Sequence, residues 1–142
     1  MIDSHKLVFL VEDNDDDRVL TMDAIRDTGV LVEIEVARDG EEALDLLFGR
    51  EERNGSKWPD VVLLDIGLPK RSGLEVLAVI RSKTQTRALP VVIFTNSDEQ
   101  RDVQTAYNLH ANSYVRKPVA HDEFVRVVGC LGEYWTTCNE TV

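Results

Sequence analysis

Short apolar runs of strand length alternate along this chain with segments of helical periodicity. The most apolar run, Val61-Val62-Leu63-Leu64, offers no polar side to a sheet, which is typical of a strand buried on both faces. Such strands, separated by helices, favour a parallel sheet covered by helices on both faces. The alternation therefore predicts an α/β fold, and 142 residues suit one domain with one core.

The pattern predicts five strand–helix units. The strands are expected at 6–11, 32–36, 60–64, 91–94 and 113–115, and the helices at 15–28, 40–48, from about 72, from 97, and over 120–135. Ser97, with Gln100 three residues later, is predicted to cap the fourth helix. Residues 49–57 are expected to form a loop or a frayed helix end. The single domain is expected to span 1–142, with its core over about 6–136 and a short C-terminal tail.

Four of the predicted strands end in chemically capable residues. Glu12 and Asp13 follow the first strand, Asp65 follows the third, Thr95 ends the fourth, and Lys117 follows the fifth. Periodicity alone does not fix the strand order, although right-handed crossovers leave few choices. In the doubly wound, five-stranded order 2-1-3-4-5 of flavodoxin and CheY, ligands bind between strands one and three. That order would gather the three acids in one crevice, with the hydroxyl and the amine beside it.

The three carboxylates would repel one another in that crevice. Either one of them is protonated, or a divalent cation neutralises them. Magnesium fits better than calcium, because it takes few protein carboxylates, keeps waters and shares oxygens with phosphate. We expect Asp13 to be a direct ligand and Glu12 to act directly or through water. Asp65 would give a third oxygen, and the carbonyl of Gly67 is placed to give another.

Asp65 is also the candidate nucleophile. A carboxylate can attack phosphorus to form an aspartyl phosphate, and the protein then has to neutralise charge on the phosphoryl oxygens. Lys117 would supply a point charge for one oxygen, and the hydroxyl of Thr95 could hydrogen-bond another. The Lys117-Pro118 bond is a candidate cis peptide, which the sequence alone leaves open.

These motifs resemble the receiver domain of two-component response regulators. The resemblance covers essentially the whole chain and rests on four segments in the family's order and approximate spacing: Val11-Glu12-Asp13-Asn14, Leu64-Asp65-Ile66-Gly67-Leu68-Pro69, Phe94-Thr95-Asn96-Ser97 and Tyr114-Val115-Arg116-Lys117-Pro118. It implies a phosphoprotein of a phosphorelay, which accepts a phosphoryl group on Asp65 from the phosphohistidine of a sensor histidine kinase.

The resemblance also implies roles for the other site residues. Magnesium would be bound by Glu12, Asp13, Asp65 and the Gly67 carbonyl, while Thr95 and Lys117 would sense the phosphoryl group. Tyr114 would be the aromatic switch residue, which turns inward when the threonine moves toward the phosphate. The protein would catalyse only its own phosphotransfer and dephosphorylation, and would signal by conformational change and protein contact without an appended output domain.

A finer resemblance lies in the second half of the chain. Residues 109–114 and 124–135 look like those of single-domain regulators paired with bacterial phytochrome kinases. The chain departs from many family members at Gly67, where they carry a side chain, and at Asp15, where many have proline. The first departure leaves the lifetime of the phosphate open, and the second is expected to act only locally.

Two other functions compete with this interpretation. A magnesium-dependent phosphohydrolase could use Asp65 as nucleophile, but it commonly needs an acid at the position of Gly67 and a cap that this length does not allow. A flavin carrier would need hydroxyls and amides after the first strand to hold phosphate. The chain instead has Glu12-Asp13-Asn14-Asp15 there, which repels phosphate.

Composition and charge limit the cellular compartment and the classes of binding partner that are expected. A net charge of -10 disfavours nucleic acid and anionic membranes as partners. The five-residue apolar run near the N-terminus is followed at once by acids, unlike a signal peptide, so a cytoplasmic protein with reduced Cys130 and Cys138 is expected. Tyr134, Tyr107 and Val125 lie off apolar stripes of helical spacing, so part of this surface is expected to be exposed and to bind a partner. We therefore predict a homodimer through the last helix.

Overall fold

Five parallel strands form the centre of the fold in a computed structural model of the chain, which describes residues 5–49 and 57–141. The strands are β1 (Lys6–Val11), β2 (Val32–Ala37), β3 (Val61–Leu64), β4 (Val91–Thr95) and β5 (Ser113–Arg116). The helices are α1 (Asp15–Asp27), α2 (Gly40–Phe48), α3 (Gly73–Ser82), α4 (Gln100–Asn108) and α5 (His121–Glu133), and α5 continues into a π-helical turn, η2 (Tyr134–Cys138). Most of the expected boundaries are met within two residues.

The strand order β2-β1-β3-β4-β5 confirms the predicted topology. Val11 at the end of β1 pairs with Ala37 of β2 and with Leu64 of β3, and Leu64 pairs with Ile93 of β4. The strands therefore end at nearly the same level. The residues at and just beyond these strand ends therefore meet at one edge of the sheet.

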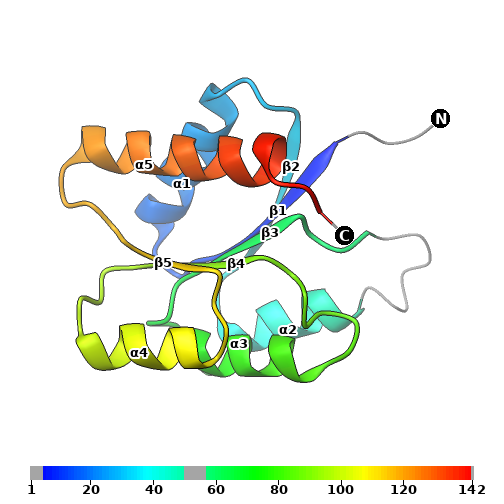
Figure 1. The fold of residues 1–142 in the computed structure, drawn as a ribbon. Helices are drawn as coiled ribbons and strands as arrows, with labels where there is room; N and C mark the ends of the chain where they lie inside the picture. The colour runs from blue at the N-terminus through cyan, green and yellow to red at the C-terminus, as the bar shows by residue number, and fades with distance from the viewer. Residues whose placement is uncertain (1–4, 50–56, 142) are drawn as a thin grey trace.

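Helices cover both faces of the sheet, as the apolar strands require. Figure 1 shows α1 and α5 on one face and α2, α3 and α4 on the other. Alternate residues of β1 serve the two layers, because Phe9 and Val11 belong to one buried cluster and Val8 and Leu10 to the other. Burying each side chain of this size stabilises the fold by about 1.5–3 kcal/mol. The central strands are therefore firmly packed, and they fix the positions of the polar residues at their ends.

The start of α4 corrects a prediction. The helix begins at Gln100 with Glu99 at the N-cap, and no side chain caps it. The hydroxyl of Ser97 instead donates to the Asp102 carboxylate at 2.5 Å, while its carbonyl accepts a hydrogen bond from Tyr114. Because Ser97 makes these contacts, it does not cap the helix as its sequence pattern predicts. Residues 96–99 form a loop beside the polar edge.

The C-terminal helix has a tight hydrogen-bonded end. In η2 the buried hydroxyl of Thr136 donates to the carbonyl of Gly132 at 2.6 Å. Cys130 and Cys138 are both free and exposed. In the two described ranges, no helix combines the length and apolar character that a membrane span requires. Most of the predicted loop at 49–57, namely residues 50–56, lies outside the described residues.

Candidate phosphoryl-acceptor site

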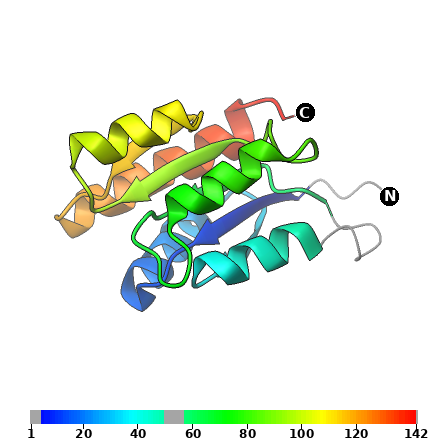
Figure 2. The same cartoon turned by 90° about the horizontal axis from the view of Figure 1, so that it is seen from below.

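A polar pocket opens at the edge where the strands end. Figure 2 shows the strand arrowheads pointing to the end of the molecule opposite the two termini. The pocket, of about 980 Å³, is lined there by residues that include Glu12, Asp13, Asp65, Thr95 and Lys117. The fold therefore brings together all five of the strand-end residues singled out in the sequence.

Asp65 lies at the centre of this group and is only 8% exposed. Its amide continues the β1–β3 ladder by donating to the Val11 carbonyl at 3.1 Å. One carboxylate oxygen, Oδ1, accepts from the Thr95 hydroxyl at 2.8 Å and from the Gly67 amide at 3.1 Å. The other, Oδ2, accepts from the Lys117 ammonium at 3.0 Å.

These donors set the ionisation of Asp65. Burial by itself would raise the pKa of the carboxyl group, because it disfavours charge. The Lys117 charge and the hydrogen bonds from Thr95 and Gly67 outweigh that effect and lower the pKa of Asp65 below its usual value. The residue is thus a buried carboxylate that stays ionised at neutral pH.

Lys117 is the cation of the site, with its side chain only 2% exposed. Its Nζ lies 2.6 Å from Glu12, 2.8 Å from Asp17 and 3.0 Å from Asp65, and 5.9 Å from the centre of the Phe94 ring. Burial would lower the pKa of the ammonium, but the hydrogen bonds that it donates to Asp17 and Glu12, together with the Asp65 charge, raise that pKa. The Lys117–Pro118 peptide is trans.

Three carboxylates are arranged as a cation would need them. One oxygen each from Glu12, Asp13 and Asp65 lies within 4.8 Å of the others, with Asp13 exposed and Glu12 buried. Burial, together with the Asp65 charge, raises the pKa of Glu12 to about 7, although the Lys117 hydrogen bond opposes the shift. A set of hard oxygen donors with excess negative charge fits a divalent cation such as magnesium.

Tyr114 connects the site to the surface of the molecule. Its hydroxyl donates to the Ser97 carbonyl at 2.9 Å, and the Ser97 amide lies 3.4 Å from the Thr95 hydroxyl that contacts Asp65. The Tyr114 amide donates to the hydroxyl of Tyr107, which is 47% exposed. A continuous set of hydrogen bonds thus runs from Asp65 through the β4–α4 loop to the α4–β5 surface.

Two residues of the site were not predicted from the sequence. Asp17, the third of three adjacent aspartates that open α1, contacts Lys117. Gly73 packs against the backbone of Asp65 and Ile66 and leaves no room for a side chain. Helical spacing could have indicated Asp17, since it lies three and four residues before the inward-facing Leu20 and Thr21.

Comparison with known proteins identifies the class that this fold and site define. The family model of the response regulator receiver domain matches residues 8–129. The chain therefore belongs to the response regulator receiver family, as the motifs had suggested.

Individual members of the family are similar to this chain over nearly its whole length. The chain is 41% identical over 135 residues to the probable methanogenesis regulatory protein FilR2 of Methanothrix harundinacea, covering 95% of this chain and 86% of that one. The structure of the phosphorylated cyanobacterial phytochrome response regulator RcpA is similar at a TM-score of 0.89 and 36% identity, covering 96% and 97% of the two chains. The Mn²⁺-bound structure of response regulator Rcp1 from Synechocystis also matches at 0.89, with 31% identity and 96% and 99% coverage.

Proposed function

We propose that this chain is a phosphoacceptor signalling protein of a two-component system and that Asp65 receives the phosphoryl group. The observation that carries the proposal is the environment of Asp65: a buried, ionised carboxylate with the Thr95 hydroxyl 2.8 Å from one oxygen and the Lys117 ammonium 3.0 Å from the other. These are the donors that a phosphoryl group on Asp65 would need.

In the proposed reaction an Asp65 oxygen attacks the phosphorus of a phosphohistidine. The new O–P bond forms as the P–N bond breaks, and the electron pair of that bond stays on the imidazole. Lys117 and Thr95 each donate to Asp65 before the reaction. A small displacement would bring both onto equatorial oxygens of the transferred group, where they stabilise its charge.

The carboxylates of Glu12, Asp13 and Asp65, with the carbonyl of Gly67, would hold magnesium. When bound, the ion supplies positive charge next to the phosphoryl oxygens. The clustered oxygens of the three carboxylates support this assignment, and the Mn²⁺-bound form of Rcp1 is a precedent among similar proteins.

Thr95 and Tyr114 would transmit the effect of phosphorylation to the surface of the protein. A shift of Thr95 toward the phosphoryl group would pull on the loop whose Ser97 carbonyl holds the Tyr114 hydroxyl. The inward position of Tyr114 would then be favoured, and the surface around α4 and β5 would change. Dephosphorylation would be the protein's own reaction, with Gly67 offering no side chain to shield the phosphate.

The phosphodonor would be a sensor histidine kinase of the phytochrome type, in the cytoplasm. Support comes from the similarity to RcpA, which is a phytochrome response regulator and which this chain matches over 97% of its length. The test is phosphotransfer from each histidine kinase of the source organism, including any phytochrome. Transfer from none of them, under conditions in which each kinase phosphorylates itself, would contradict the assignment.

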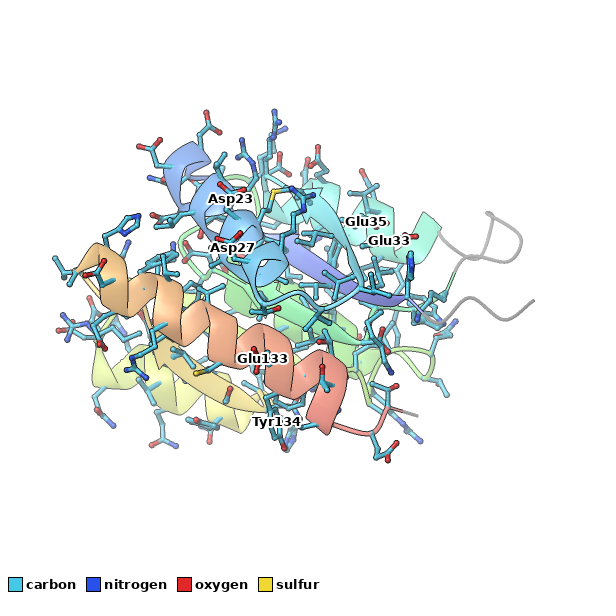
Figure 3. All side chains as sticks on the ribbon, turned by 90° about the horizontal axis from the view of Figure 1, so that it is seen from above. Asp23, Asp27, Glu33, Glu35, Glu133 and Tyr134 are labelled. Carbon is cyan, nitrogen blue, oxygen red and sulfur yellow. The ribbon has the colours of Figure 1, made fainter. Side chains whose placement is uncertain are left out.

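We further propose a homodimer through the region of α5. Tyr134, the first residue of η2 and 51% exposed, lies on the side of the C-terminal helix away from α1 (Figure 3). Asp23, Asp27 and Glu133 instead face outward on the α1/α5 layer. Two copies meeting through that acidic face would bring like charges together, so the side with Tyr134 suits the contact better. A monomer mass by light scattering at high concentration, with and without phosphorylation, would exclude the dimer.

A further inference from the structure

All three N–H donors of Lys117 are matched by carboxylates, one from the loop after β1, one from α1 and one from the loop after β3. The partners are Glu12 at 2.6 Å, Asp17 at 2.8 Å and Asp65 at 3.0 Å. An ammonium has three donors and no acceptor, and this side chain is only 2% exposed. Lys117 therefore reaches a new oxygen only if one of these three contacts changes.

Two of the three partners change during the proposed reaction. Glu12 belongs to the group of carboxylates that would hold the cation, and a bound cation competes with Lys117 for its oxygens. Asp65 becomes an acyl phosphate, so its carboxylate charge is lost from the oxygens that Lys117 contacts. Both contacts therefore weaken at the stage when the ammonium has to stay near the phosphoryl group.

Asp17 is the partner that the reaction leaves unchanged. It lies outside the carboxylate group that would hold the cation, on the first turn of α1. The side chain of Asn14 fixes this turn by accepting from the Asp17 amide at 2.9 Å. The Asp17 side chain is 25% exposed, against 2% for the lysine, so it approaches the ammonium from the rim of the pocket.

We propose that Asp17 is a positioning residue for phosphotransfer: its carboxylate keeps the Lys117 ammonium at the phosphoacceptor while Glu12 turns to the metal ion and Asp65 becomes phosphorylated. The inference rests on the function proposed above. It assigns to the third acid of the Asp15-Asp16-Asp17 run a task that its neighbours do not share.

The test is the initial rate of phosphorylation by acetyl phosphate with Mg²⁺, followed by intact mass. Replacing Asp17 by Ala is expected to slow the reaction about tenfold, the order expected for one charge-assisted hydrogen bond. Asp17→Glu should recover part of the rate, and Asp17→Asn, which keeps the size but not the charge, should fall between Ala and wild type. Asp23→Ala removes an acid from the outer face of the same helix (Figure 3) and should leave the rate unchanged.

A double-variant cycle separates this role from a structural one. If Asp17 acts through Lys117, Asp17→Ala should change the rate less than about twofold in a Lys117→Met background, since coupled residues are non-additive. An equal loss in both backgrounds would overturn the inference, as would a wild-type rate in Asp17→Ala. Wild-type protein that takes up no phosphoryl group would instead overturn the proposed function, and this inference with it.

Discussion

A Cβ atom on Gly73 would overlap the backbone carbonyl oxygen of Asp65 and would lie 2.6 Å from the Cα of Ile66. The start of α3 is therefore packed directly against the chain that carries the central carboxylate, and the Gly73 amide donates to the Ile66 carbonyl at 3.1 Å. The position of Asp65 depends on the absence of a side chain eight residues later in the sequence.

Gly73→Ala is expected to destabilise the protein by about 1–3 kcal/mol or more, because the obstructing atoms are backbone and cannot rotate away. It should also slow phosphorylation by displacing Asp65. Gly129→Ala is the matched control, since its Cβ would make an ordinary contact of 3.6 Å with Thr28. That change should be neutral or stabilising in a helix, and equal melting temperatures for the two variants would refute the packing argument.

Asp13→Asn is expected to weaken magnesium binding strongly while changing the free energy of unfolding by less than about 0.5 kcal/mol. The reason is that Asp13 is an exposed member of the carboxylate group. Glu12→Gln should affect both quantities, because Glu12 also accepts from the buried Lys117 at 2.6 Å. Calorimetric titration with Mg²⁺ measures the first effect and urea unfolding the second. An unchanged titration for Asp13→Asn would remove this residue from the ligand set.

Tyr114→Phe removes the hydroxyl that holds the Ser97 carbonyl at 2.9 Å. We expect a loss of about 0.5–1.5 kcal/mol and faster amide exchange in residues 96–99. Tyr134→Phe serves as the control, because Tyr134 lies on the exposed end of the C-terminal helix. If exchange in the loop is the same in both variants, the tyrosine does not hold the loop.

Asp60 carries out a structural task at the opposite edge of the sheet. Buried at 5% exposure, it accepts from the Leu7 amide at 2.8 Å and joins the start of β1 to β3. Asp60→Ala leaves that buried amide without its acceptor and should cost about 1–3 kcal/mol. Asp60→Asn keeps an oxygen acceptor and should lose less. Chemical unfolding of the two variants checks the difference, and equal losses would show that the hydrogen bond is not the cause.

The strands and the five strand-end residues could be predicted because each depends on local signals: an apolar run, the residue that ends it, and a topology with few alternatives. The contact between Asp17 and Lys117 could not, because it joins residues 100 positions apart. Helical spacing indicates at most which of the three adjacent aspartates faces inward, and it does not identify the partner. The prediction that Ser97 caps α4 was wrong for a related reason. The local sequence fits a helix cap, but Ser97 instead contacts Asp102 and Tyr114 and lies in the loop before the helix.

Val19 shows the same limit in the first helix. An apolar residue in an amphipathic segment is expected to face the core, yet Val19 is 54% exposed while Thr21 and Ala24 are buried. α1 packs against α5 and its Asp17 contacts Lys117, and neither contact is a local property of the sequence.

Chemical mapping of the phosphoryl group tests the central claim most directly. Protein treated with acetyl phosphate and Mg²⁺ is reduced with borohydride, which converts an aspartyl phosphate to homoserine, and the peptides are then sequenced by mass spectrometry. We predict homoserine at position 65 in the wild type and none in Asp65→Asn. Homoserine at Asp13 or at any other acid, or an adduct that persists in Asp65→Asn, would contradict the account.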